Sequence, residues 1–255
     1  MKITRAVVPS LFTILNIFCG FRSILHSSEG DYVLAAWFIV LAGIFDVLDG
    51  VLARITKSSS DFGVEFDSLA DVVSFGAAPA LLIYNLNLHF LEGLGMLLSA
   101  MPMIFGALRL ARFNAQLVGY DKDYFKGLPV PASAITISSF VLTFYHPGVG
   151  LNIIESSILP AMVVILSLLM VSNIRYDAVP KFSKRGIKQH PLRFTIGIVG
   201  LTAIIMTRGQ ALFPFFGFFV ATGPLRYIVQ SIQQTLHPAT KQTDENGAEV
   251  SSIDV

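Results

Sequence analysis

Long apolar runs separated by short polar stretches make up most of this 255-residue chain. Roughly 17–25 apolar residues suit an α-helix that crosses a bilayer, and most of the runs have about that length. The runs are continuous rather than alternating at every second position, which argues against a β-barrel. The pattern predicts an all-α polytopic membrane protein with about eight transmembrane helices, at residues 6–21, 32–54, 63–88, 90–113, 130–145, 153–173, 192–207 and 211–232.

Composition supports this class. Hydrophobic residues make up 53% of the chain and charged residues only 14%, whereas a soluble domain carries roughly a quarter charged residues. The net charge of +1 gives no global field that would attract nucleic acid, and we expect no such partner. A single cysteine, Cys19, excludes an intramolecular disulfide and a cysteine-rich metal site.

The distribution of Lys and Arg predicts an orientation. With the N-terminus inside, all of the 18 basic residues except Arg22 and Arg208 fall on the inner side. Cytoplasmic loops are the ones enriched in Lys and Arg. We therefore expect a multi-pass protein of the cell membrane with both termini in the cytoplasm. The polar tail, residues 237–255, is predicted to be a disordered cytoplasmic segment.

Four acidic residues interrupt the second and third apolar runs. Asp46 and Asp49 are spaced i,i+3 on one predicted helix, and Asp67 and Asp71 are spaced i,i+4 on the next, so each pair shares a face. Acidic side chains at membrane depth are costly unless they pair, line a polar cavity or bind a cation. The loop between the two helices is short, so the helices are predicted to be adjacent and antiparallel, with the two pairs meeting.

Converging carboxylates favour a site for hard cations. Oxygen-only ligands suit Mg²⁺, Mn²⁺ or Ca²⁺ rather than zinc or copper. Two such cations are the common apparatus of phosphoryl and phosphodiester displacement. Small residues beside the acids, Gly50, Ala53 and Gly63, leave helix surface bare for a planar or phosphate group. Arg54 adds a cation that matches phosphate geometry. Taken alone, the glycines also fit close helix packing.

These residues resemble, at every fixed position, the signature of the CDP-alcohol phosphotransferases: Asp46-x2-Asp49-Gly50-x2-Ala53-Arg54-x8-Gly63-x3-Asp67-x3-Asp71. The resemblance implies transfer of a substituted phosphate from a CDP-linked donor to an alcohol, with release of CMP. It also implies a six-helix membrane core, usually homodimeric, whose site opens to the cytoplasm. Here two further C-terminal helices would follow that core.

The resemblance assigns roles residue by residue. Asp46, Asp49, Asp67 and Asp71 would hold two divalent metal ions, with Asp71 also acting as the base. The CDP moiety would lie against the small residues and the cation of the signature, namely Gly50, Ala53, Arg54 and Gly63. We expect one integral-membrane catalytic domain over residues 1–236, with the core at about 1–176 and the extra helices at about 192–232.

The acceptor alcohol follows from other stretches. Five segments resemble the phosphatidylserine synthase branch, at residues 9–21, 74–80, 109–114, 127–132 and 169–176. The substrates would then be CDP-diacylglycerol and L-serine. Arg109 and Arg112 can bind the serine carboxylate, and Asn114 can accept from its ammonium group. The ordinary alternative is that both arginines only anchor a helix end at the inner membrane surface.

Two competing functions remain open at this stage. The same chemistry could use glycerol 3-phosphate or inositol phosphate, although a phosphorylated acceptor would need a denser basic pocket. A divalent-cation or proton-coupled transporter would also place acids in the membrane. A transport pathway should continue across the bilayer. The opposite half of the membrane is expected to hold little acid beyond the loop or helix-end residues Glu29, Asp31, Glu92 and Glu155.

Overall fold

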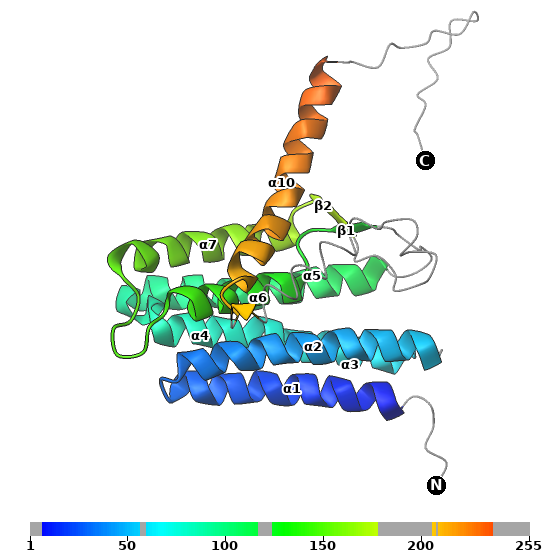
Figure 1. Cartoon of the computed structure of the whole chain (residues 1–255). Helices are drawn as coiled ribbons and strands as arrows, with labels where there is room; N and C mark the ends of the chain where they lie inside the picture. The colour runs from blue at the N-terminus through cyan, green and yellow to red at the C-terminus, as the bar shows by residue number, and fades with distance from the viewer. Residues whose placement is uncertain (1–6, 57–59, 117–123, 178–205, 208, 237–255) are drawn as a thin grey trace, which may run out of the picture.

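The computed structural model describes residues 7–56, 60–116, 124–177, 206–207 and 209–236. Nearly parallel and antiparallel helices form a bundle, which α10 leaves at a steep angle (Figure 1). The helical elements are α1 (Val7–Ser28), α2 (Tyr32–Thr56), α3 (Asp61–Asp71), the π-helix η1 (Val72–Ala77), α4 (Ala78–Leu86), the 3-10 helix η2 (Leu88–Leu91), α5 (Glu92–Gln116), α6 (Val130–Phe144), α7 (Ile153–Val171) and α10 (Leu212–Leu236).

The helical membrane class predicted from the sequence is confirmed. Within the described residues, five helices are long and apolar enough to cross a membrane: Tyr32–Thr56, Asp61–Leu86, Leu88–Ala115, Ile153–Val171 and Leu212–Val229. α3, η1 and α4 follow one another directly and form one of these five. The predicted span at residues 192–207 lies almost wholly outside the described residues, as does the predicted tail, so the count of eight spans stays a prediction.

Local side-chain chemistry sets several helix ends. Gly30 adopts a φ of 83° in the turn after α1, and the Asp31 carboxylate then accepts a hydrogen bond from the Leu34 backbone N–H at 3.2 Å. Ser60 caps α3 by accepting from the Gly63 backbone N–H at 3.1 Å. Such caps satisfy backbone donors that the first helical turn leaves free. The turns therefore hold α1 against α2 and start α3 beside the end of α2.

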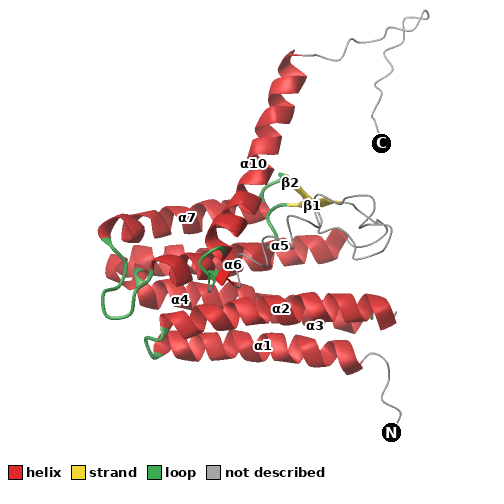
Figure 2. Cartoon of the chain, in the orientation of Figure 1, coloured by secondary structure: helices red, strands yellow, loops and turns green. Residues whose placement is uncertain are grey.

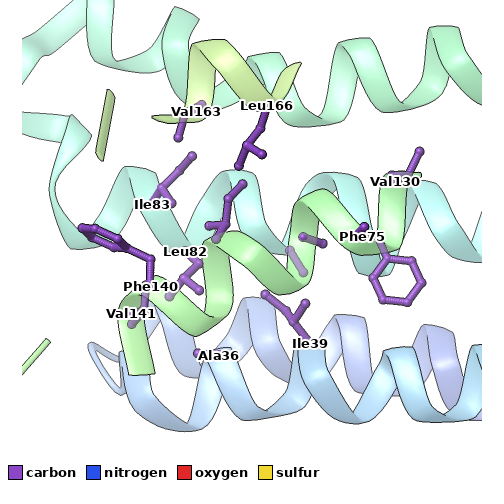
Figure 3. Close-up of a cluster of buried hydrophobic side chains, with 14 of the residues drawn as sticks. Ala36, Ile39, Phe75, Leu82, Ile83, Val130, Phe140, Val141, Val163 and Leu166 are labelled. Carbon is purple, nitrogen blue, oxygen red and sulfur yellow. The ribbon is translucent and has the colours of Figure 1, made fainter. Parts of the chain in front are cut away.

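The core lies around α6, which has ten buried residues out of 15. Side chains from α2, α4 and α7 meet there, among them Ile39, Leu82 and Val163 (Figure 3). A helix enclosed by other helices is expected to be apolar on all sides. α6 is shorter than the five spans but is apolar overall, and the polar residues that it buries are small hydroxyl side chains, Ser133, Thr136, Ser138 and Ser139.

A small antiparallel β-pair, which the all-helical prediction did not include, joins β1 (Tyr124–Lys126) to β2 (Arg175–Asp177) (Figure 2). The following turn is fixed by Gly127, whose φ is +78° and whose N–H donates to the Ile174 carbonyl at 2.8 Å. The sequence pattern missed the pair because each strand is only three residues long. Its effect is to tie the segment before α6 to the end of α7.

Packing of α10 onto the bundle uses aromatic rings. Phe213 makes edge contacts with Phe140 and Phe144 of α6, with ring centroids 5.6 and 5.3 Å apart. An apolar cavity of about 610 Å³ opens between α6, α7 and α10. No acidic or basic side chain lines it, so it lacks the groups that would bind a nucleotide or a cation.

Candidate metal and substrate site

Three acids converge where the end of α2 meets α3. Ligand oxygens of Asp46, Asp67 and Asp71 all lie within 4.8 Å of one another. The i,i+4 spacing of the last two places them on one face of α3, and that face is turned toward α2. We call this end of the bundle, with the C-terminal end of α2 and α3, the acidic end (right in Figure 1).

Asp49 is not one of the three grouped aspartates, but its side chain lies near them. Its side chain is 7% exposed and accepts a hydrogen bond from the Thr13 hydroxyl of α1. Its charge interacts with those of Asp46 and Asp67. The structure therefore brings all four predicted acids into one electrostatic cluster. Direct ligation of a metal by Asp49 stays a prediction.

The donor set of the cluster fits a divalent cation. Three carboxylates held this close repel one another, and a cation relieves that repulsion. Asp71 is 7% exposed, and its Oδ1 is buried without a hydrogen-bond partner. Buried polar atoms are normally paired, so an orphaned carboxylate oxygen points to a missing ligand. Oxygen donors alone favour Mg²⁺, Mn²⁺ or Ca²⁺.

The residues predicted to hold the CDP moiety line the outer part of this end. Gly50 is exposed, and a Cβ added there would meet nothing within 4 Å. Arg54 folds back along its own helix, where its Nε donates to the Gly50 carbonyl at 2.9 Å. Gly63 belongs to the first turn of α3, and Ala53 is half-buried. Open space beside Gly50 is what the approach of a flat base to a helix backbone requires.

The three residues predicted to bind serine have different surroundings. Arg109 is 7% exposed, its Nε has no hydrogen-bond partner, and its charge interacts with Asp71. Arg112 instead donates to the backbone carbonyls of Val171 and Ser172 at the end of α7 and of Lys126 in β1. Asn114 donates to Ser68 of α3 at 3.0 Å. Arg109 thus interacts with the acid cluster, whereas Arg112 and the amide nitrogen of Asn114 tie α5 to its neighbours. The Oδ1 of Asn114 is buried without a partner, so its binding of the serine ammonium stays a prediction.

Sequence reasoning missed the contribution of α1. Thr13 and Asn16 are both buried and both reach the acid cluster, Thr13 at Asp49 and Asn16 at Asp71. Small or polar residues continue along the same face of the helix at Gly20, Ser23 and Ser27. The spacing of 3, 4, 3 and 4 residues was readable in the sequence as a polar stripe on an apolar helix. Nothing in the sequence, however, showed which neighbour the stripe faced.

Sequence comparisons show which known proteins this chain is similar to. The sequence model of the CDP-alcohol phosphatidyltransferase family matches residues 6–171, more than half of the chain. The chain belongs to this family. It is 40% identical over 222 residues to a CDP-diacylglycerol–serine O-phosphatidyltransferase of Helicobacter pylori, covering 86% of this chain and 90% of the relative.

Two further relatives come from distant organisms. An archaetidylserine synthase of Methanothermobacter thermautotrophicus is 41% identical over 181 residues, which are 70% of this chain and 73% of that protein. A CDP-diacylglycerol–serine O-phosphatidyltransferase of Bacillus subtilis is 34% identical over 178 residues, 69% of this chain and 92% of the relative. For this CDP-alcohol phosphatidyltransferase, the acid cluster of α2 and α3 therefore lies inside the region that defines the family.

Proposed function

We propose that this protein transfers the phosphatidyl group of CDP-diacylglycerol to the hydroxyl of L-serine, giving phosphatidylserine and CMP. The observation that carries the proposal is the convergence of Asp46, Asp67 and Asp71 at one end of a membrane bundle. The names of relatives at 34–41% identity support serine as the acceptor. In the reaction a bond forms between the serine oxygen and the β-phosphorus, and the bond to the CMP oxygen breaks.

Different side chains of this protein have different roles in the proposed reaction. Asp71 accepts the proton of the attacking serine hydroxyl, because its charge interacts with that of the buried Arg109, which we assign to the acceptor carboxylate. The open helix surface at Gly50 receives the cytosine ring. A divalent cation pair held by the four aspartates would offset the charge of the pyrophosphate and of the leaving CMP. Mg²⁺ or Mn²⁺ is our choice, with Ca²⁺ as the third candidate.

The membrane context completes the proposal. The diacylglycerol chains remain in the bilayer while the headgroup enters the acidic end. That end faces the cytoplasm of the cell, as the distribution of Lys and Arg predicts, and serine enters from that side. We also propose a homodimer, as is usual in the family.

The decisive experiment is an assay of CMP release by the purified protein in detergent or lipid nanodiscs. CDP-diacylglycerol is supplied with L-serine, glycerol 3-phosphate, inositol phosphate or no acceptor, each in Mg²⁺, Mn²⁺ or Ca²⁺. We expect release only with serine and a divalent cation, and a fall of at least about a hundredfold when a chelator removes the metal. Equal release with a phosphorylated acceptor would overturn the choice of serine.

A transporter is the competing class. Liposomes containing the protein but no CDP-diacylglycerol should then show uptake of divalent metal or a metal-dependent proton current. We expect neither, because the acids gather at one end of the described helices instead of lining them from end to end. Metal uptake without the nucleotide lipid, together with no CMP release, would replace the enzyme proposal.

A further inference from the structure

Asn16 of α1 is a buried amide whose side-chain carbonyl oxygen has no donor. The residue is 0% exposed, and its Oδ1 makes no hydrogen bond. Its amide N–H group interacts with the Asp71 carboxylate of α3. A buried polar atom that lacks a hydrogen bond is costly, so the unpaired Oδ1 calls for an explanation.

The backbone of Asn16 is held in place. Its carbonyl accepts a hydrogen bond from the Ser74 hydroxyl of η1 at 2.9 Å. One turn further along α1, Gly20 lets the two helices approach so closely that any side chain there would overlap Ser74. Ser74 follows Asp71 by three residues, and a π-helix at this point is a feature often found at functional sites. The Asn16 amide is therefore presented to Asp71 by a rigid contact.

Three orphaned buried groups meet at this point. The Asp71 Oδ1, the Arg109 Nε and the Asn16 Oδ1 lack hydrogen-bond partners, and the three side chains come from α3, α5 and α1. The charge of Arg109 interacts with that of Asp71, and the Asn16 amide N–H group interacts with the same carboxylate. A cation bound at the acids would account for the carboxylate oxygen. It would not account for a guanidinium, which only donates.

We infer that Asn16 and Arg109 form the subsite for the zwitterionic end of the amino-acid acceptor, with Asn16 selecting its ammonium group. Donor and acceptor chemistry assigns the two ends. Arg109 has only donors and so pairs with the carboxylate. An ammonium also has only donors, and the unpaired Oδ1 of Asn16 beside Asp71 is a neutral acceptor for it. Among the described residues, the other buried, unpaired side-chain amide oxygen, Asn114 Oδ1, belongs to a side chain that is held by Ser68. This assignment rests on the proposed transfer to serine.

The test compares L-serine with glycerate, which keeps the carboxylate and the reacting hydroxyl but has a second hydroxyl in place of the ammonium. A hydrogen bond to a charged group is worth about tenfold to a hundredfold in affinity. In Asn16→Ala we expect the KM for serine to rise about tenfold or more. The KM for CDP-diacylglycerol and kcat should stay within about twofold. The preference for serine over glycerate, as a ratio of kcat/KM, should fall about tenfold.

Matched variants separate binding from folding. Ser23→Ala removes another buried, unpartnered polar group from the same face of α1, two turns away from the acids, and should leave every constant unchanged. Asn16→Asp retains an acceptor oxygen at the same place. It should keep the serine KM within about threefold of wild type and should use glycerate still more poorly, because a second negative charge repels that acid.

The outcomes are distinct. The inference is overturned if Asn16→Ala leaves the serine KM or the serine-to-glycerate ratio unchanged, or raises the donor KM as much as the serine KM. If Asn16→Ala does not fold, Asn16→Asp decides: a loss of preference for serine in that variant contradicts the role of Oδ1. A wild-type protein that releases CMP without serine, or not at all, would instead refute the proposed function itself.

Discussion

Two groups of polar side chains at opposite ends of the bundle differ in their hydrogen bonding. At the end where α1 turns into α2, Ser27, Asn85 and Tyr32 form a connected network. Buried Ser27 donates to the Leu81 carbonyl, half-buried Asn85 donates to Ser27, and half-buried Tyr32 donates to the Asn85 carbonyl, at 3.2, 3.0 and 2.9 Å. At the acidic end, Asn16, Asp71 and Arg109 are buried, yet each has a polar atom without a partner.

The difference teaches what each end does. A paired polar group in the membrane stabilises one arrangement of helices and leaves nothing for a ligand. An unpaired buried polar group lowers the stability of the protein without ligand. It can form its hydrogen bonds when a ligand binds. The same helix, α1, supplies both kinds, with Ser27 at one end of its stripe and Asn16 near the other. Substitutions at the two ends should therefore separate stability from activity.

The largest effect should come from Asp71→Asn. We expect serine-dependent CMP release to fall by about a thousandfold or more, because the change removes both a proton acceptor and a carboxylate ligand. Stability without metal should be equal or higher, since one of three repelling carboxylates is gone. The measurements are CMP release and thermal unfolding in the presence of a chelator. Normal turnover in this variant would remove the assignment of Asp71 as the base.

Gly20→Val should have the next largest effect and should lower both stability and activity. The added side chain would overlap the Ser74 backbone and force α1 away from η1. Overpacking of this kind costs about 1–3 kcal/mol, and the displacement also moves Asn16 from Asp71. Thermal unfolding and CMP release should therefore fall together. If only stability falls, the α1–η1 contact is not needed to shape the site.

Gly50→Ala should lower donor binding without loss of stability. A Cβ at Gly50 meets no protein atom within 4 Å, and replacing a helical glycine by alanine favours the helix by about 0.5–1 kcal/mol. The KM for CDP-diacylglycerol should rise about tenfold if the cytosine lies against this surface. Gly93→Ala, at another open glycine near the start of α5, is the control and should not change that KM. An unchanged donor KM in Gly50→Ala would move the nucleotide elsewhere.

Asn85→Leu tests the paired end. Leucine has a similar volume but cannot donate to Ser27, so the free energy of unfolding should fall by about 1 kcal/mol. The kcat and both KM values should match those of wild type. Chemical unfolding monitored by tryptophan fluorescence and the CMP assay measure the two quantities. A loss of turnover larger than the loss of folded protein would mean that this end also shapes the site.

Tyr176→Phe should change stability as little as Asn85→Leu and tests a paired buried hydroxyl of β2. Tyr176 is buried and donates to the Val220 carbonyl of α10 at 3.1 Å, and burial raises its pKa to about 12. The raised pKa means a contribution to stability that is complete below about pH 10 and is lost as the pH rises toward 12. The variant should lose about 1 kcal/mol at neutral pH and lack that alkaline component. Identical alkaline unfolding curves would contradict the buried, protonated phenol.

The apolar runs predicted most of the helices, and the acidic signature predicted the acid cluster. Apolar runs of spanning length are decided locally, because a helix is the simplest way to satisfy the backbone within a bilayer. Hence α2, α5 and α7 begin and end close to the predicted residues. The β-pair was missed, because three-residue strands carry no pattern and depend on a partner some 50 residues away in the chain.

In the candidate site, too, the sequence predicted some features and missed others. Arg109 and Arg112 are one turn apart on α5, and the sequence gives no reason to assign them different roles. The bundle then directs Arg109 toward Asp71 and gives Arg112 to three backbone carbonyls. Thr13 and Asn16 looked like polar positions in an apolar run until α1 was placed beside the acids.

By itself, the sequence determined the helical membrane class, the four acids and the family, because these depend on residue type and on spacing within one or two helices. The tertiary structure decided which polar groups acquire partners, since that depends on how α1, α3 and α5 meet. Glycine at position 20 and the Ser74 hydroxyl bring α1 against η1. That contact leaves Asn16 and Asp71 facing each other with unused hydrogen-bonding atoms.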